Sequence, residues 1–478
     1  GGAMLGQLWL GLVLAAAGPL VSDGRLQADR VNALVAVDAE AAPGLVAFQP
    51  GSHAKFYMHG WREPGQWLRW TVRSDAEQVL EATVVVRRFG PTPLRVELSA
   101  AGQTLTALLP ADASAWWERL RLEGRLTIPA GGCPITLRLA AAEPGQAFDA
   151  QVQSVELVRP EVRAEQDRAA LALRADPAWF QAARYGIMVH WTAQSMPLTG
   201  EPKPYAEAAA AFDVERFAEQ MARCGAGFVV FTTAHALQYF PAPLAELERR
   251  LPGRCSQRDL VGDLADALGR RGIRLMLYYH LGAPDDAAWM AASGFWEADA
   301  TRLFDGMRAI VSEAGERYGQ RLAGWWFDDG ATSIYPRSAP WESLARAAKA
   351  GYPQRLIAFN AWELGNPTPF HDFCTGEGCQ EPRGFGGVLQ PGGDGRYPRG
   401  SHAGLQASAC LITERDWGHF QRNTPLPPPK WTADQLESLL RGFIACRNVP
   451  IFDFEITQDG QMSEATLALF EQVYSRLR

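Results

Sequence analysis

Polar side chains follow several short apolar runs in the second half of the chain, and their types could support chemistry. One residue of this kind is usually a helix cap or a satisfied core group. Several together fit a site that binds a hydroxyl-rich ligand through many hydrogen bonds. The positions are His190, His235, Tyr279 with His280, Asp328 with Asp329, the segment 372–377, and Glu414.

The run Trp325-Trp-Phe-Asp-Asp-Gly330 contains the strongest candidate for a catalytic group. Cleavage of a glycosidic bond normally needs one carboxyl group to attack the anomeric carbon and a second to protonate the departing oxygen. A strand ending here would present Asp328 beside two tryptophans, a setting that can hold an oxocarbenium-like transition state. Alternation along the strand turns Asp329 away and predicts a structural role for it.

A parallel sheet would bring these strand ends together, and the pattern after Pro160 predicts one because strands and helices alternate. Apolar residues at three- and four-residue spacing indicate the helices, and Thr432 with Gln435 resembles a capping box. The arrangement predicts a (β/α)8-type barrel over residues 165–478, with its chemistry at the carboxyl ends of the strands. The predicted strands are 185–191, 228–233, 274–280, 325–329, 356–360, 371–374, 410–413 and 449–456.

Residues 34–160 have a different pattern, with short alternating runs separated by turns such as Pro129-Ala-Gly-Gly132. This pattern predicts an all-β sandwich of jelly-roll type, and it resembles the carbohydrate-binding modules often fused to glycosidases. Such modules often hold calcium. Asp38 and Glu40 could supply part of that site, but Gln153 stands where an acid is expected, so we predict no calcium. The sandwich could bind sugar or brace the barrel, and bracing is slightly favoured.

Composition limits the possible partners. The net charge is -7 and the pI is about 5.7, and no Lys/Arg cluster offsets this balance, so nucleic acid is not an expected partner. The seven cysteines show no zinc-like spacing, and we predict neither a metal nor a cofactor. The expected partner is a glycan substrate, and the sequence leaves the oligomeric state open.

The first 33 residues form a separate N-terminal segment. Leu5 to Ala17 is apolar apart from Gln7 and has the length of a signal-peptide core, but no Lys or Arg precedes it. A packed strand or short helix explains it equally well. The run is too short to span a bilayer, and no other apolar run is longer. With the usual habitat of modular glycosidases, this favours a secreted or periplasmic protein.

The barrel half resembles glycoside hydrolase family 29, the α-L-fucosidases. The similar segments are Arg184-Tyr-Gly-Ile-Met-Val-His-Trp191, Arg258-Asp-Leu-Val-Gly-Asp-Leu264, Trp326-Phe-Asp328 and Asp372-Phe-Cys-Thr-Gly-Glu377. The resemblance covers about 300 residues. It implies a retaining exo-glycosidase that removes terminal α-L-fucosyl residues through a covalent intermediate.

The resemblance assigns roles residue by residue. It implies that Asp328 is the nucleophile and that Glu377 is the acid/base, with Glu414 second and Glu381 third. The residues that would bind the sugar or line the pocket are His190, Trp191, His235, Tyr279, Trp326, Glu414 and Trp417.

Three positions depart from the family pattern. Ala236 replaces one of two sugar-binding histidines, Thr192 replaces a glycine, and Asn360 stands where an arginine is expected. Because unmatched buried polar groups are costly, such losses usually accompany a changed substrate. A glycosidase for another sugar and a non-catalytic carbohydrate-binding protein are the alternatives. A metal-dependent hydrolase using His190, His235 and Asp328 ranks below both.

Residues 375–404 form a Gly- and Pro-rich stretch with many charges. A loop of this length is uncommon unless it is functional or disordered. Because it follows the proposed acid/base strand, we predict a wall or lid of the cleft.

Overall fold

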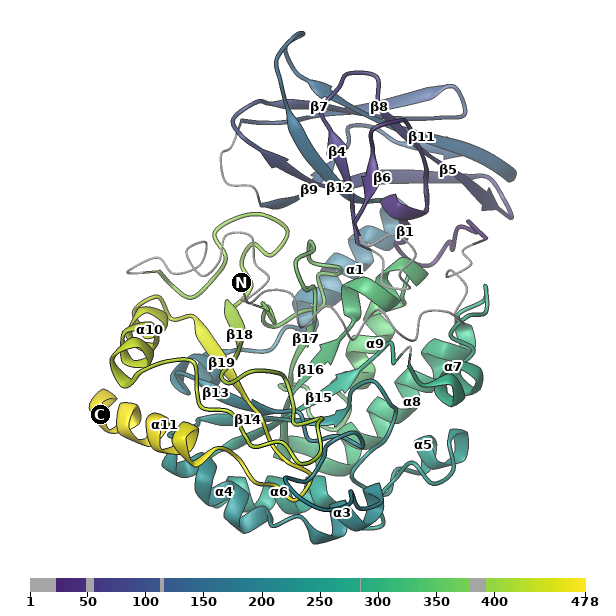
Figure 1. Ribbon diagram of the computed structural model, residues 1–478. Helices are drawn as coiled ribbons and strands as arrows, with labels where there is room; N and C mark the ends of the chain where they lie inside the picture. The colour runs from purple at the N-terminus through teal and green to yellow at the C-terminus, as the bar shows by residue number, and fades with distance from the viewer. Residues whose placement is uncertain (1–22, 49–55, 112–115, 284, 378–392) are drawn as a thin grey trace.

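The computed structural model describes residues 23–48, 56–111, 116–283, 285–377 and 393–478 (Figure 1). The predicted N-terminal apolar run and Glu381 lie outside these residues, as does the middle of the predicted lid. Antiparallel β sheets come first, and a mixed α/β part with a curled parallel sheet follows them. The coarse prediction of an all-β part before an α/β part is therefore confirmed.

Two antiparallel sheets pack face to face in the first part. One has the order β10-β6-β12-β4-β3, with β1 beside β12 and β9 beside β6, and the other has the order β2-β5-β11-β7-β8. Alternate residues of β5, such as Leu68, Trp70 and Val72, are buried in the shared core, as its period-two pattern predicts. The elements are β1 (Asn32–Val35), η1 (Ala36–Asp38), β2 (Glu40–Ala41), β3 (Val46–Ala47), β4 (Met58–Trp61), β5 (Trp67–Ser74), β6 (Gln78–Phe89), β7 (Leu94–Ala100), β8 (Gln103–Leu109), β9 (Trp117–Arg121), β10 (Leu126–Ile128), β11 (Gly131–Ala141) and β12 (Asp149–Val158).

The second part contains a parallel sheet in the order β17-β16-β15-β14-β13-β19-β18. Its strands are β13 (Gly186–Val189), β14 (Phe228–Ala234), β15 (Arg274–His280), β16 (Leu322–Asp328), β17 (Leu356–Phe359), β18 (Ser408–Ile412) and β19 (Val449–Phe454). Helices lie around the outside of the curled sheet in Figure 1. They are α1 (Pro160–Leu173), α2 (Ala178–Ala182), α3 (Tyr205–Ala211), α4 (Val214–Arg223), α5 (Ala245–Arg250), α6 (Leu260–Gly269), α7 (Ala287–Ser293), α8 (Thr301–Tyr318), α9 (Trp341–Ala348), α10 (Ala433–Ala445) and α11 (Glu464–Leu477). The predicted capping box is present at Thr432 and Gln435.

Alternation sorts the side chains of this sheet into two faces. Residues on the concave face form one cluster, which includes Met188, Tyr278 and Trp326. Their neighbours in the sequence pack outward in a larger cluster with the helices, as Trp325 and Tyr279 do. Side chains at the strand ends can therefore reach a shared site only from the concave face.

The edges of the parallel sheet, β17 and β18, are linked by the segment 372–377. The Asp372 amide donates to the Ile357 carbonyl at 2.9 Å, and the Cys374 amide donates to the Gln406 carbonyl at 2.9 Å. Glu377 forms a parallel bridge with Cys410. The strand predicted at 371–374 is thus replaced by isolated bridges, of Phe373 with Gln406 just before β18 and of Glu377 with Cys410 in β18.

The sandwich and the α/β part share buried polar contacts. The Tyr335 hydroxyl donates to Glu156 Oε1 at 2.7 Å and lies 2.6 Å from Ser154 Oγ. Arg119 pairs with the same glutamate. Tyr335 begins the short helix η4 (Tyr335–Arg337), directly after a π-helical turn, η3 (Gly330–Ile334), that follows β16. The sandwich is therefore bonded to the turn that continues the Asp328 strand.

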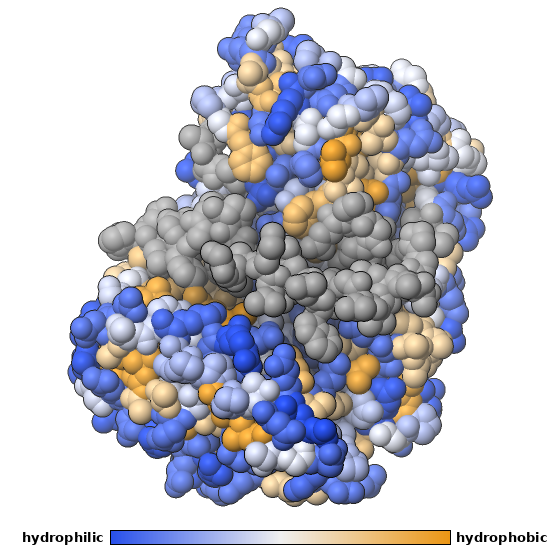
Figure 2. Space-filling model, in the orientation of Figure 1, coloured by the Kyte–Doolittle hydropathy of each residue, from blue (hydrophilic) through white to orange (hydrophobic). Residues whose placement is uncertain are grey.

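The visible surface is mainly hydrophilic, and its apolar residues are scattered in small groups (Figure 2). Isolated apolar residues of this kind are normal on a protein surface and mark no interface. Among the described residues, no helix has both the length and the apolar character needed to cross a membrane.

Candidate active site

Asp328 lies at the carboxyl end of β16 on the concave face, and its carboxylate accepts three hydrogen bonds. The Tyr278 hydroxyl donates to Oδ2 at 2.5 Å. Oδ1 accepts bonds from Asn360 Nδ2 and from the backbone amide of the next residue, Asp329, at 2.8 Å each. The side chain keeps 17% of its surface exposed. Asp328 is therefore both oriented and reachable.

Asn360 joins Asp328 to Glu377. Its Nδ2 lies 2.8 Å from Asp328 Oδ1 and 2.5 Å from Glu377 Oε1, so those two oxygens are at most about 5.3 Å apart. The orientation of the amide is fixed because its Oδ1 accepts bonds from Thr375 Oγ1 at 2.9 Å and Trp362 N at 3.0 Å. Nδ2 must then face the two carboxyl groups.

The two carboxyl groups differ in protonation. Burial, with the nearby charge of Asp328, raises the pKa of Glu377 to about 8. Burial also opposes the ionisation of Asp328, but the His280 ring and hydrogen bonds from Asn360 and Tyr278 outweigh it and lower the pKa. At neutral pH Asp328 is ionised and Glu377 is mainly protonated. Carboxyl groups whose environments separate their pKa values in this way can divide the roles of nucleophile and acid.

Three histidines stand next to Asp328 on the concave side. The His235 ring centroid lies 5.4 Å from those of both His190 and His280. Burial lowers the pKa of His190 to about 4 and that of His235 to about 3. His190 Nδ1 is held 2.7 Å from Asp453 Oδ1. Neutral rings in this position can exchange hydrogen bonds with hydroxyl groups of a ligand.

Aromatic rings form the rest of the site. Tyr278 stacks on Trp326 with centroids 5.2 Å apart, and Trp417 lies 5.4 Å from His190. The structure therefore places His190, His235, Trp326 and Trp417 around Asp328 and Glu377.

The predictions for Trp191 and Tyr279 need correction. Both side chains point away from Asp328 and pack in the outer cluster with the helices. The Trp191 indole donates to the Gln458 carbonyl at 2.8 Å. The residue that contacts Asp328 is Tyr278, which lies on the opposite face of β15 from Tyr279.

Glu414 also needs correction, because its carboxylate faces α11 instead of the site. Thr466 Oγ1 donates to Glu414 Oε1 at 2.5 Å, and the Glu455 amide donates to Oε2 at 3.0 Å. Burial raises the pKa of Glu414 to about 8. A raised pKa alone does not make this residue the acid, because both oxygens are already engaged by Thr466 and by the Glu455 amide.

Asp329 fastens the turn after the nucleophile strand, in keeping with a structural role. It has a left-handed backbone with φ of 61°. Its carboxylate accepts bonds from Thr332 and Ser333 at 3.0 Å each, and it lies 3.5 Å from His280 Nε2. A π-helical turn at a functional site is common, and here Asp329 holds it beside the nucleophile.

His235, His280 and Asp328 are a possible set of metal ligands, because one atom of each lies within 4.8 Å of the others. The Ala283 amide donates to His280 Nδ1 at 2.8 Å. The neutral ring must then carry its proton on Nε2, the nitrogen that faces the aspartates. A metal needs the lone pair of that atom, so these residues fit a divalent ion poorly.

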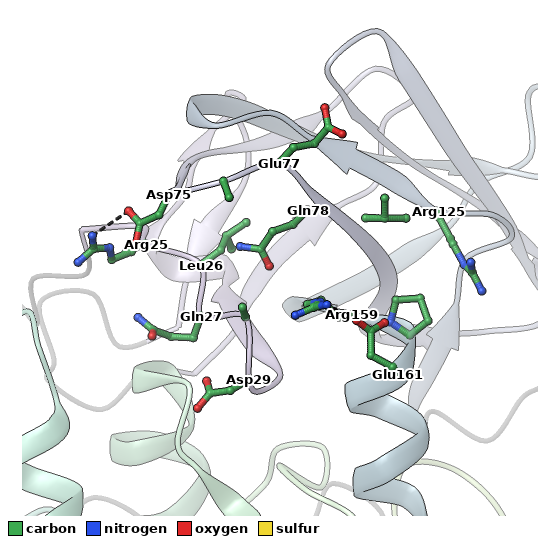
Figure 3. Close-up of a pocket in the computed structure, with 14 residues that line it drawn as sticks. Arg25, Leu26, Gln27, Asp29, Asp75, Glu77, Gln78, Arg125, Arg159 and Glu161 are labelled. Atoms are coloured by element: carbon green, nitrogen blue, oxygen red, sulfur yellow. Dashed lines mark hydrogen bonds and ion pairs between the residues drawn. The ribbon is translucent and has the colours of Figure 1, made fainter.

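A second hollow lies on the sandwich, between the first described residues and the start of α1 (Figure 3). Two ion pairs lie within it, Arg25 with Asp75 at 2.8 Å and Arg159 with Glu161. None of the residues that form the Asp328 site lines it. We therefore assign the chemistry to the Asp328 site.

Comparison with known proteins agrees with the motifs. Residues 206–378 match the family described as Alpha-L-fucosidase. The human tissue alpha-L-fucosidase is 30% identical over 195 residues, which are 34% of this chain and 40% of the human protein. The enzyme of Macaca fascicularis is 30% identical over 162 residues, or 27% of this chain and 34% of that protein. The resemblance to the α-L-fucosidases is confirmed, and the matches span about two-fifths or less of these relatives.

Solved structures give a looser likeness. An alpha-L-fucosidase of glycoside hydrolase family 29 from Bacteroides thetaiotaomicron has a TM-score of 0.47 at 16% identity. The alignment covers 64% of this chain and 74% of that one. A trapped covalent intermediate of such an enzyme from the same organism has a TM-score of 0.44 at 17% identity, with 64% and 75% covered.

Proposed function

We propose that the chain is a retaining exo-acting α-L-fucosidase, with Asp328 as nucleophile and Glu377 as acid/base. The observation that carries this proposal is the Asn360 amide, which bonds both carboxyl groups and keeps their nearest described oxygens at most about 5.3 Å apart. Retaining enzymes hold their carboxyl groups about 5–5.5 Å apart, whereas inverting enzymes need about 6.5–9.5 Å to admit a water.

In the first step, Asp328 Oδ2 attacks the anomeric carbon while the bond from that carbon to the leaving oxygen breaks. The proton of Glu377 passes to the departing oxygen. In the second step, Glu377 removes a proton from water, the water oxygen attacks the same carbon, and the ester to Asp328 breaks. The bond from Tyr278 at 2.5 Å keeps the Asp328 carboxylate in place between the two steps.

Binding of the sugar falls to the groups around this pair. In the proposal, His190 and His235 bond the sugar hydroxyls as neutral rings, and Trp326 and Trp417 border the ring carbons. Asp453 supports His190 by fixing the tautomer of its ring through the 2.7 Å contact at Nδ1. The proposal that the whole protein acts on a glycan is based on this same arrangement.

We propose further that the parallel sheet forms a (β/α)8-type barrel, with residues 372–377 standing in for the sixth strand. Their bonds to both sheet edges support this. The proposed domains are the N-terminal segment 1–33, the sandwich 34–160 and the catalytic part 165–478. A secreted or periplasmic location stays a proposal that rests on the N-terminal apolar run and on the usual habitat of such enzymes.

The test is hydrolysis of 4-nitrophenyl α-L-fucoside by the full chain, with Asp328→Asn and Glu377→Gln in parallel. We expect turnover that Asp328→Asn abolishes. Incubation with 2-fluoro-fucosyl fluoride should release the anomeric fluoride and add one 2-fluoro-fucosyl group to the intact mass, and peptide mapping should place that group on Asp328. Release of the opposite anomer as first product, or labelling of another residue, would refute the retaining mechanism or the nucleophile.

Ala236 favours one alternative, a glycosidase for a different sugar. The residue offers no hydrogen-bonding side chain at a position where the family has a histidine. Activity on another aryl glycoside with silence on the fucoside would establish that reading. Glycan binding without turnover, unchanged by Asp328→Asn, would establish a non-catalytic carbohydrate-binding protein.

A further inference from the structure

An aromatic cluster joins the sandwich to the loop that follows Asn360. Phe56 and Phe48 of the sandwich pack against Trp362, with ring centroids 4.5 and 6.0 Å from it. Phe48 also stacks on Tyr57 at 4.9 Å. Nearby, the Trp117 indole donates to the Glu363 carbonyl at 2.7 Å. The sandwich thus holds this loop in a defined position.

Trp362 and Phe48 differ from the other rings in this cluster. Phe56, Tyr57 and Trp117 are buried, whereas Trp362 and Phe48 are only half-buried. Among the described residues the Trp362 indole N–H has no hydrogen-bond partner, and it is not one of the buried unsatisfied atoms. The indole therefore has both a partly open face and a free donor.

The backbone of Trp362 is strained. Its φ is 51°, a left-handed conformation that is unusual for a bulky side chain. Strain of this kind persists only where surrounding contacts impose it, and it is concentrated at functional sites. Here the contact is the Trp362 amide, which donates to Asn360 Oδ1 at 3.0 Å.

This bond places the backbone of Trp362 next to the Asn360 side chain that also binds Glu377. Asn360 Nδ2 binds Glu377, and Glu377 must lie beside the glycosidic oxygen in order to protonate it. Two hydrogen bonds through Asn360 thus connect Trp362 to the acid. The sugar that departs with that oxygen emerges next to Glu377.

We propose that Trp362, supported by Phe48 of the sandwich, forms the subsite for the leaving-group sugar. This inference rests on the proposed function. The half-open indole face stacks on the carbon-bound hydrogens of a pyranose ring, and the indole N–H donates to one of its hydroxyls. The sandwich then contributes to specificity for the leaving group, while the fucosyl pocket lies wholly in the α/β part.

The test compares two substrates that share the fucosyl group. α-L-Fucosyl fluoride has no leaving-group sugar, whereas an α-L-fucosyl-N-acetylglucosamine disaccharide has one. We expect Trp362→Ala to lower kcat/KM for the disaccharide roughly tenfold or more relative to the fluoride, because the ring contact is lost. Trp362→Phe should recover much of the loss, and Phe48→Ala should cause a smaller selective loss. Trp67→Ala, at a half-buried tryptophan of β5 in the other sheet, is the matched control and should alter neither substrate.

The fluoride also shows whether each variant is folded. An equal loss on both substrates, or no loss on the disaccharide, would overturn the subsite. Failure of the unaltered protein to hydrolyse either substrate would refute the proposed function itself, and the subsite with it.

Discussion

Asn360 is the residue whose removal tests the site most directly. In Asn360→Ala the two carboxyl groups lose their shared donor, while the Asp328 bonds to Tyr278 and to its neighbour's amide remain. Because the amide stabilises the ionised form of each group, its loss raises the pKa of both Asp328 and Glu377. Both limbs of the pH profile should therefore move to higher pH.

The magnitude follows from the charged hydrogen bond. A hydrogen bond to an ionised group contributes roughly 1.5–3 kcal/mol. If its loss costs a comparable amount in the alignment of Asp328 and Glu377 at the transition state, kcat/KM should fall roughly ten- to a hundredfold. Asn360→Asp should cost more, since it places a third carboxylate against the other two and would need a proton to fit.

The assay is kcat/KM for 4-nitrophenyl α-L-fucoside from about pH 4 to 10, together with thermal unfolding of each variant. Asn360→Gln serves as the conservative comparison, because it keeps the amide on a longer side chain. A pH profile that keeps its position while activity falls would show that Asn360 acts only through the fold. Unchanged activity would show that the bridge is not part of the mechanism.

Three further predictions concern the charges. Because the acid must be protonated and the pKa of Glu377 is about 8, kcat/KM for a disaccharide should fall as the pH rises through about 8. Tyr278→Phe removes a donor to Asp328, so the pKa of Asp328 should rise and turnover should fall roughly tenfold at neutral pH. Lys349 Nζ lies 2.8 Å from Asp372 Oδ2 in the interior, so Lys349→Met should lower the free energy of unfolding by about 3–5 kcal/mol.

Each of these predictions has its own control. The departing fluoride needs no proton, so kcat/KM for fucosyl fluoride should not fall as the pH rises through about 8. An identical fall with the fluoride would show that Glu377 is not the group that causes it. For Tyr278→Phe, an acid limb that does not move contradicts the assigned bond. Urea unfolding measures the Lys349 effect, and the double variant with Asp372→Asn should regain part of the stability, because no unpaired charge remains buried.

The sequence predicted most of the parallel strands and the position of Asp328 at a strand end, because both depend on local pattern. Asp328 follows an apolar run, and strand ends of a parallel sheet converge. The same alternation could have separated Tyr278 from Tyr279, since Met276, Tyr278 and His280 share one parity. Position at the strand end favours Tyr279, whereas the face of β15 selects Tyr278.

Other parts of the site depend on contacts that no local pattern encodes. His235 faces inward because the register of β14 shifts between Thr232 and Ala234, which reverses the alternation. Glu414 stands at a strand end yet turns toward α11, where Thr466 and the Glu455 amide satisfy it. The sequence marks Asn360 only as a departure from the family's arginine, because its contact with Glu377 joins two segments that no local pattern pairs.

The Tyr335 hydroxyl lies on the turn after β16 and is bonded to Glu156 of the sandwich. This bond argues against expressing the sandwich or the α/β part alone. An engineer who trims the first 160 residues would remove the acceptor for that hydroxyl and loosen the turn beside Asp328. If the sandwich were grafted onto another barrel, the ion pair of Glu156 and Arg119 would be transferred without the Tyr335 hydroxyl that donates to Glu156. Recombination and truncation libraries should therefore keep both parts together and place their breakpoints on exposed turns far from this network.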